Sequence, residues 1–234
     1  MKAKSLIIVF IFPFLLGISS ERHSPKNTDT PVALVKKIVQ NVTYRKSDQS
    51  DWDVAKTGLP LYDGGQVKTE SKSLALILFT DGSGLLRVRE NSLLNVYGKP
   101  ENKKLNKNTY IDKGLIGFDI NKQADEEFKF TTPSAVASIR GTAGSLEVDK
   151  DSATTIILEK GTLEFQALTG DKRSGTLTGG NTARIERRGN VKINLSTEED
   201  KNKNNSTKNL NTKKVKIKTK FGDVELEYYS PEEK

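Results

Sequence analysis

The residues of this chain best suited to chemistry are two carboxylates beside its single tryptophan. Asp51 and Asp53 flank Trp52. Paired acids can hydrolyse a glycosidic bond, and an aromatic ring beside them can hold a sugar. A carbohydrate-active enzyme or a glycan binder is therefore one hypothesis. The sequence offers few other residues suited to acid–base catalysis, and we expect no catalytic residues in this protein.

A lone arginine in the stretch "AVASIRGTAGSLEV", residues 135–148, is the second candidate. Apolar residues alternate on both sides of the glycines, which predicts two strands joined by a turn, with Ile139 opposite Leu146. Arg140 would then lie on the face away from the core and donate to carbonyls of the turn or to Glu147. A carboxylate or phosphate clamp is the alternative, but no second arginine and no glycine-rich helix start accompanies it.

Glycine-rich and acidic clusters complete the candidates. The stretches "DGGQ", "DGSG" and "GGNT" precede no predicted helix and lack the spacing of a phosphate-binding loop, so we expect turns. The clusters "DEE" at 125–127 and "EED" at 198–200 do not have the spacing of a calcium loop, so we expect solvated acids.

The residue inventory excludes several kinds of site. The 234 residues contain no cysteine and one histidine, His23. Disulfides, thiolate catalysis and cysteine metal sites are thereby excluded, as are paired-histidine metal sites and a triad built on a core histidine. We expect no cofactor and no metal. Because the catalytic inventory is also missing, we expect a protein that is not an enzyme.

The net charge of +8 is a mild excess spread along the chain. Nucleic-acid binding usually needs a clustered basic stripe with interleaved aromatic residues, and the sequence has none. We therefore expect no nucleic-acid partner. A weak attraction to anionic polymers or membrane surfaces stays open.

The N-terminus resembles an export signal over residues 1–20. Two lysines precede the apolar run Leu6–Ile18, and the small residues Gly17 and Ser19 predict cleavage between Ser19 and Ser20. The alternative is an uncleaved membrane anchor. Both place the remaining chain outside the cytoplasm, periplasmic or extracellular, and the missing cysteine excludes a lipoprotein. A flexible segment over residues 21–31 follows.

Residues 32–195 carry a pattern of short strands with almost no helical periodicity. The run 74–79 is apolar on both faces, and the turn dipeptide Asp81-Gly82 follows it. Turn signals recur every eight to twelve residues. We predict an all-β domain, either an antiparallel sandwich or a short solenoid-like stack.

Two further segments follow this domain. Residues 196–212 are rich in Lys and Asn and predict a disordered linker. Residues 213–229 alternate strictly and predict a hairpin with a lysine strand beside a glutamate strand and a turn at Gly222-Asp223. Its lysines, Lys213 to Lys220, form either a solvated edge or a contact with an anionic surface. Residues 230–234 are a tail.

Several stretches together carry a family resemblance. They are "W…A..G..L..GG.VKT" from Trp52, "S.ALILFTDGSGLLRVRENSLL" at 73–94, "FKFTTPSAVASIRGTAGSLEV" at 128–148, "T.ILEKGTLEF" at 155–165 and "LTGGNTARIERRG" at 177–189. Over residues 34–190 the chain resembles the FecR-like domain of exported bacterial proteins. The motif residues that the resemblance leads us to expect in structural roles are Asp81, Gly82, Pro133, Arg140, Gly141 and Thr142.

The resemblance implies an exported domain that binds a protein partner in cell-envelope signalling or assembly. Better-known members place this domain behind a cytoplasmic anti-sigma segment and a membrane helix, and relay the occupancy of an outer-membrane transporter. Here only five residues precede the apolar run. A non-enzymatic binding or scaffold module is therefore our leading expectation. A membrane-anchored signalling regulator, retaining residues 6–18, is the alternative.

Overall fold

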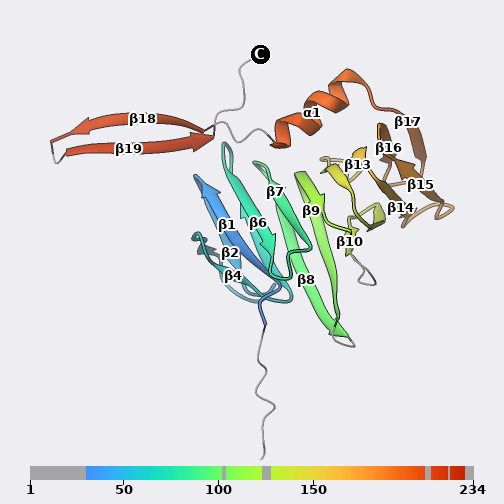
Figure 1. Cartoon of the computed structure of the whole chain (residues 1–234), viewed down its shortest axis with the longest axis horizontal. Helices are drawn as coiled ribbons and strands as arrows, with labels where there is room; N and C mark the ends of the chain where they lie inside the picture. The colour runs from blue at the N-terminus through green and yellow to red at the C-terminus, as the bar shows by residue number, and fades with distance from the viewer. Residues whose placement is uncertain (1–29, 102–103, 123–127, 209–211, 221, 230–234) are drawn as a thin grey trace, which may run out of the picture.

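The computed structural model describes residues 30–101, 104–122, 128–208, 212–220 and 222–229, which form strands and one helix (Figure 1). The predicted all-β class is confirmed. The proposed signal peptide and most of the flexible segment after it lie outside the described residues. No helix within these ranges is long and apolar enough to cross a membrane.

Two layers of strands, sheet A and sheet B, pack face to face. Sheet A follows the spatial order β4 (Pro60–Leu61), β1 (Ala33–Val39), β6 (Leu74–Phe79), β7 (Gly84–Val88), the second part of β9 (Lys104–Ile120), β12 (Ala143–Val148), β13 (Thr154–Lys160), β16 (Asn181–Ile185) and β17 (Val191–Leu195). Sheet B follows the order β3 (Asp53–Val54), β2 (Val42–Arg45), β5 (Gly65–Thr69), β8 (Leu93–Glu101), the first part of β9, β10 (Phe128–Thr131), β11 (Ala135–Ile139), β14 (Thr162–Ala167) and β15 (Ser174–Thr178). Neighbours are antiparallel except β9 and β10. The arrangement corresponds to the sandwich alternative.

Strand β9 belongs to both layers and joins them. It pairs with β8 in sheet B up to Lys113, and with β7 and β12 in sheet A from Gly114 onward. The chain changes layer at Gly114, which has a φ of 103°. A Cβ there would lie 2.1 Å from the Ser92 hydroxyl oxygen. Only glycine fits both this backbone conformation and this close approach.

The core lies between the two sheets and follows from period-2 alternation along the strands. Phenylalanines from both layers meet at its centre. Phe79 of sheet A and Phe128 of sheet B have ring centroids 4.8 Å apart, edge to face, and Phe118 and Phe130 lie 5.1 Å apart. These contacts hold the sheets together, so the outer faces are available to carry polar side chains.

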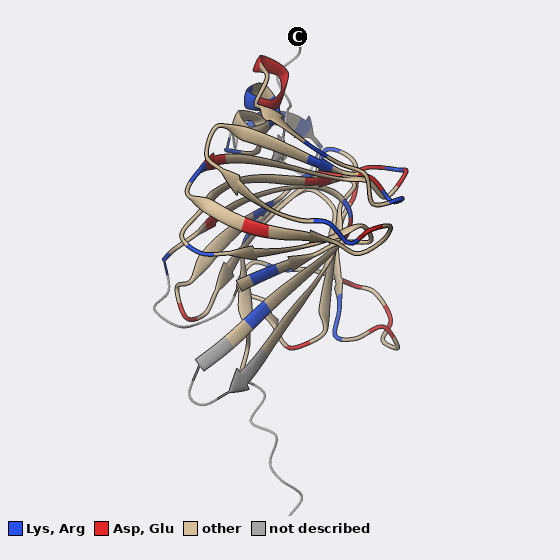
Figure 2. Cartoon of the chain, turned by 90° about the vertical axis from the view of Figure 1, so that its right-hand side faces the viewer, with Lys and Arg blue, Asp and Glu red and all other residues tan. Residues whose placement is uncertain are grey.

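The segment expected to be a disordered linker contains helix α1 (Glu198–Lys208), and that expectation was wrong. The helix begins with a capping box: Thr197 Oγ1 accepts from the Asp200 amide at 3.2 Å, and Asp200 accepts from the Thr197 amide at 2.9 Å. The "EED" acids form its first turn, which is red in Figure 2. Negative charge there interacts favourably with the positive N-terminal end of the helix dipole. The helix lies against the outer face of sheet A. It has no apolar stripe, which is why periodicity missed it.

The predicted C-terminal hairpin is confirmed as β18 (Thr212–Thr219) and β19 (Gly222–Tyr229), which pair only with each other among the described strands. Figure 1 shows it projecting from the two-layer domain. Its lysine strand lies beside its acidic strand as expected: Lys216 is opposite Glu225, and Lys218 is opposite Asp223.

Candidate binding site

A groove on the outer face of sheet B gathers aromatic, amide and charged side chains from four neighbouring strands. The strand register places Arg45 of β2 opposite Gln66 of β5, Gln66 opposite Asn95 of β8, and Asn95 opposite Tyr110 of β9. Each of these residues alternates with a residue of the opposite face, such as Val67 or Ile111, that is fully buried in the core. The core alternation therefore forces this row of polar side chains outward.

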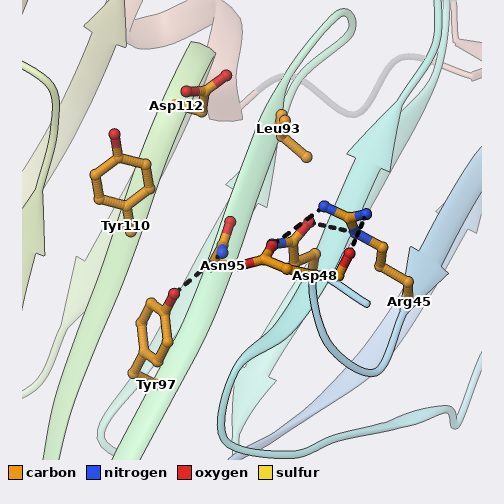
Figure 3. Close-up of a pocket in the computed structure, with 8 residues that line it drawn as sticks. Arg45, Asp48, Leu93, Asn95, Tyr97, Tyr110 and Asp112 are labelled. Atoms are coloured by element: carbon orange, nitrogen blue, oxygen red, sulfur yellow. Dashed lines mark hydrogen bonds and ion pairs between the residues drawn. The ribbon is translucent and has the colours of Figure 1, made fainter. Parts of the chain in front are cut away.

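The groove has a volume of about 380 Å³. Figure 3 shows Tyr97 and Tyr110 on the adjacent strands β8 and β9, with Arg45 and Asp48 at the opposite end. The lining residues are Arg45, Asp48, Gln66, Leu93, Asn95, Tyr97, Tyr110 and Asp112. Leu93 is the one aliphatic residue among them, so the lining of the groove is polar and aromatic rather than aliphatic.

One end of the groove is held rigid by a network around Arg45. Its Nε donates to Gln66 Oε1 at 2.7 Å, and its two terminal nitrogens reach the carbonyl and the carboxylate of Asp48 at 2.9 and 3.1 Å. The Gln66 amide nitrogen donates to the same carboxylate. The guanidinium and the amide are thus fixed in position by each other and by Asp48.

The other end presents polar atoms that the described residues leave unused. Asn95 Nδ2 donates to the Tyr97 hydroxyl at 3.1 Å. Within the described ranges, no hydrogen bond engages Asn95 Oδ1, the Tyr110 hydroxyl or the Asp112 carboxylate. Burial raises the pKa of Tyr110, and the nearby Asp112 and Tyr97 raise it further. This phenol is therefore a neutral donor and acceptor across the physiological range.

Trp52 lies beside this groove. The Arg45 guanidinium carbon is 4.8 Å from its ring centroid, and Lys68 Nζ is 5.2 Å away. Both cations belong to the outer face of sheet B, which places the half-buried indole there. Asp51 and Asp53 on either side of it are exposed. The sequence singled out this neighbourhood through Trp52 and its two acids, but did not connect it with the residues of the groove.

The C-terminal hairpin offers a second surface. Val215, Ile217, Val224 and Leu226 are 42–46% exposed. The register sets Val215 against Leu226 and Ile217 against Val224, so these side chains share one face of the hairpin. Lysines and acids occupy the other face, where Lys214 and Glu225 form an ion pair at 2.7 Å.

The motif residue Asp81 begins the turn between β6 and β7 and forms an ion pair with Lys107 of β9. The Lys107 side chain is 0% exposed. Burial raises the pKa of Asp81, but hydrogen bonds from Lys107 and Ser83 outweigh that effect and leave the pKa below its ordinary value. Gly82 has a φ of 72° in this turn. The turn therefore holds the Asp81 carboxylate against the Lys107 ammonium and has Gly82 in a left-handed backbone conformation.

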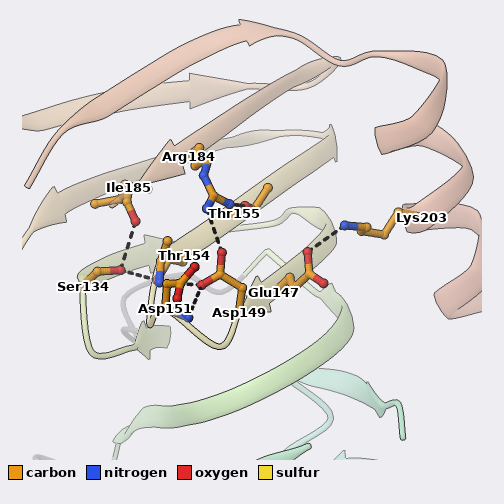
Figure 4. A network of polar contacts seen from close by, with 10 residues as sticks. Ser134, Glu147, Asp149, Asp151, Thr154, Thr155, Arg184, Ile185 and Lys203 are labelled. Atoms are coloured by element: carbon orange, nitrogen blue, oxygen red, sulfur yellow. Dashed lines mark hydrogen bonds and ion pairs between the residues drawn. The ribbon is translucent and has the colours of Figure 1, made fainter. Parts of the chain in front are cut away.

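Pro133 lies in the turn between β10 and β11, and its neighbours Thr132 and Ser134 belong to a buried network of hydroxyl groups. Figure 4 shows Ser134 of this network beside Thr154 and Ile185. Thr132 Oγ1 and Ser134 Oγ each lie 2.6 Å from Thr154 Oγ1, and Ser134 Oγ donates to the Ile185 carbonyl at 3.2 Å. The network ties this turn of sheet B to β13 and β16 of sheet A. The Thr-Pro motif therefore connects the two layers.

The predicted hairpin around Arg140 is wrong. β11 pairs with β10 and β14 in sheet B, whereas β12 pairs with β9 and β13 in sheet A. The turn at Arg140–Thr142 therefore carries the chain from one layer to the other. Glu147 forms an ion pair with Lys203 of α1 at 2.7 Å. Arg140 is exposed, Gly141 has a φ of 68°, and the Thr142 side chain is buried.

The motif residues do not converge on one site: Asp81 and Gly82 lie in one turn, Pro133 in a second and Arg140–Thr142 in a third. The three glycine-rich stretches provide turns, with positive φ at Gly64, Gly82 and Gly180. The acids at 125–127 lie outside the described residues. Within the described ranges, no group of three or more His, Cys, Asp or Glu residues could hold a metal ion.

Sequence reasoning missed the groove because its residues come from four separate strands. The available signal was the set of outward-facing residues on each strand. Gln66, Asn95 and Tyr110 alternate with core residues and have large planar polar side chains, whereas outward positions of a strand more commonly have Ser, Thr or Lys. Their juxtaposition depends on the register, which the sequence alone did not supply.

The fold defines the chain as a two-layer, all-β domain protein with a C-terminal hairpin. Residues 65–164 match the family model described as FecR protein. Over these residues the chain is similar to the FecR family, and the matched segment lies inside the span that carried the resemblance.

Solved structures were compared as well. Two crystal structures of "a putative anti-sigma factor from Parabacteroides distasonis ATCC 8503", at 2.50 and 1.65 Å resolution, each align with a TM-score of 0.49 and 10% identity over 57% of this chain. The alignment spans 61% of the length of those chains. No curated protein matches the chain.

Proposed function

We propose that this protein is an exported, non-enzymatic FecR-domain module that binds a protein partner in cell-envelope signalling or assembly. The FecR match over residues 65–164 supports the signalling context. The lysine-led apolar run before Ser20 supports export. The hairpin supports binding.

The observation that carries the proposal is the apolar face of the hairpin. Val215, Ile217, Val224 and Leu226 stay nearly half exposed on two strands that pair with no other described strand. An isolated two-stranded hairpin is marginal in water, and it gains stability when its apolar face is covered. The outer backbone edges of β18 and β19 are also available to pair with an added strand.

The charge pattern of the hairpin favours a protein partner over an anionic surface. Its lysines face acids on the neighbouring strand: Lys216 is opposite Glu225, and Lys218 is opposite Asp223. These pairs largely neutralise the lysine strand, so its attraction to lipid headgroups or a wall polymer is weak. Apolar contact surrounded by balanced charge is the pattern of a protein interface.

A pull-down from envelope extracts with the full chain tests this function. We expect the wild type to recover a protein that Ile217→Asp fails to recover, because the new carboxylate would have to be desolvated in the apolar contact. Lys216→Ala, on the same strand but the opposite face, is the matched control and should recover it. Recovery of nothing above background, or equal recovery by Ile217→Asp, would contradict the proposal.

A membrane-anchored regulator that retains residues 6–18 is the second candidate, favoured by the apolar character of that run. N-terminal sequencing of the protein isolated from the envelope separates the two. A start at Ser20 or Glu21 supports the exported, cleaved form. A start at Met1 in a membrane fraction supports the anchor.

A further inference from the structure

We propose that the groove on the outer face of sheet B is a binding site for a short, uncharged oligosaccharide. It is a different surface from the hairpin, so this inference does not depend on the proposed function. Four features carry it: aromatic faces, unused hydroxyl-binding atoms, a rigid polar network and an extended shape.

The aromatic side chains provide stacking surfaces for sugar rings. Tyr97 and Tyr110 lie on neighbouring strands of the groove (Figure 3). Trp52 lies beside the Arg45 end, with the Arg45 guanidinium carbon 4.8 Å from its ring centroid. A pyranose ring presents C–H groups on its faces, and the electron-rich face of an aromatic ring attracts them. Tyrosine and tryptophan also have a polar group at the ring edge, which suits a ligand that stays partly hydrated when bound.

The atoms between these rings match the hydroxyl groups of a sugar. Asn95 Oδ1 and the Asp112 carboxylate are acceptors, and the Tyr110 hydroxyl can donate or accept. None of them has a hydrogen-bond partner among the described residues. Each sugar hydroxyl can both donate and accept a hydrogen bond, so neighbouring hydroxyls of one sugar can pair with these amide, carboxylate and phenol groups. The opposite end, held by Arg45, Asp48 and Gln66, presents its polar atoms in a fixed arrangement.

Other ligand classes fit the groove less well. A phosphate needs available cationic donors, but Arg45 is bonded to Gln66 and Asp48, and Lys68 forms an ion pair with Glu70 at 3.1 Å. A peptide that adds as a strand needs a free sheet edge. Here β5 and β8 are each paired on both sides, so their backbone groups are already used. An apolar ligand would meet Leu93 as the one aliphatic lining residue.

The shape of the site indicates an oligomer rather than a monosaccharide. The row from Arg45 to Tyr110 crosses four neighbouring strands, which is about 14 Å at the usual strand spacing. The groove runs over an open sheet face without closing around a single ring. A chain of a few sugar rings can contact the tyrosines and the Arg45 end at once.

The test is a titration of the full chain with chitotriose, cellotriose and maltotriose, measured by calorimetry and by saturation-transfer NMR. Trp52 is the single tryptophan and lies beside the groove, so its fluorescence gives a third readout. Tyr110→Ala removes a stacking surface, and Asp112→Ala removes an exposed acceptor with little risk to the fold. Gln166→Ala is the control, because Gln166 is exposed on the same face of sheet B but on the distant strand β14.

We expect at least one trisaccharide to bind the wild type and Gln166→Ala equally, and to bind Tyr110→Ala at least tenfold more weakly. Asp112→Ala should weaken binding severalfold with an unchanged melting temperature. The proposal is overturned if no trisaccharide binds the wild type at millimolar concentration. It is also overturned if both groove variants, checked for folding by circular dichroism, bind as tightly as the wild type.

Discussion

Thr207 of helix α1 lies directly over Gly117 of β9, so close that a Cβ added to the glycine would come within 2.3 Å of the threonine Oγ1. Thr207 is fully buried there. The helix contains no apolar residue in its sequence EEDKNKNNSTK. It is held instead by Lys203 on Glu147 and by Asn204 and Lys208 on Glu159. Close backbone approach and charged contacts together keep a polar helix on the sheet.

Substituting Gly117 with alanine should therefore lift α1 from sheet A. The added methyl group overlaps Thr207, and the helix can move outward more easily than β9 can, since β9 is paired on both sides in this layer. We expect faster amide hydrogen exchange in residues 198–208 and a small loss in the unfolding free energy, about 1 kcal/mol.

Ser145→Ala is the matched control for this variant. Ser145 is the register partner of Gly117 and is fully buried, and its hydroxyl lacks a hydrogen-bond partner among the described residues. Removing that hydroxyl should leave α1 in place and the stability unchanged or slightly higher. Equal exchange rates in α1 of the wild type and Gly117→Ala would show that the close approach does not determine helix position.

Acid should also release α1. The side-chain hydrogen bond from Lys208 is the main cause that lowers the pKa of Glu159 below its ordinary value of 4.5. A group with a lowered folded-state pKa stabilises the fold above its unfolded pKa and loses that contribution as the pH falls through the folded value. Helix protection against hydrogen exchange, corrected for the intrinsic rate, should be constant near neutral pH and fall below about pH 4.5.

Glu159→Gln is the control for the acid effect. It should show reduced helix protection already at neutral pH and a flatter response to acid. High salt should reduce the protection of the wild type in the same direction, because the contacts are partly exposed charge pairs. A helix whose corrected protection is the same at pH 7 and pH 3.5 would contradict this account.

The ion pair between the partly exposed Asp81 and the fully buried Lys107 should respond unequally to removal of its two partners. Asp81→Asn leaves a fully buried ammonium without this carboxylate and should cost about 2 kcal/mol at pH 7. Lys107→Met keeps the volume of the buried side chain and removes its charge, so it should cost less than about 1 kcal/mol. Urea unfolding of both variants measures the difference, and a larger loss for Lys107→Met would contradict it.

The pH dependence of the same pair has a defined sign. The pKa of Asp81 lies below its ordinary value of 3.8, so the stabilisation is present at neutral pH and is lost as the pH falls through the folded pKa. The gap in unfolding free energy between the wild type and Asp81→Asn should therefore narrow below about pH 4. A gap that stays constant down to pH 2.5 would assign the loss to packing instead.

Local pattern predicted much of the fold. The alternation in residues 213–229 gave the hairpin and the lysine strand beside the acidic strand, because each depends only on neighbouring residues. The alternation around Arg140 identified two strands correctly but not their partners. A turn that joins two layers and a turn that joins a hairpin share the same residue types, and only long-range pairing distinguishes them.

The missed features likewise depended on distant contacts. Helix α1 is stabilised by Glu147 and Glu159, more than 35 residues away along the chain, and its own residues show no helical apolar period. The groove needs the registers of β2, β5, β8 and β9 at once. The residue types alone identified Trp52 as a candidate. They could not show that Asn95 and Tyr110 belong to the groove beside it.

The turn at Arg140–Thr142 allows a final test of what this motif does. Gly141 has a φ of 68°, and a Cβ there would lie 3.1 Å from the Lys122 Cβ. Gly141→Ala combines a strained backbone with a tight contact and should cost about 1–3 kcal/mol of unfolding free energy. Arg140 is exposed, and exposed charge contacts contribute about 0.2–1 kcal/mol, so Arg140→Ala should cost less. Thermal unfolding of both variants gives the order directly. A larger loss for Arg140→Ala would make the arginine, rather than the glycine, the residue that fixes the passage from sheet B to sheet A.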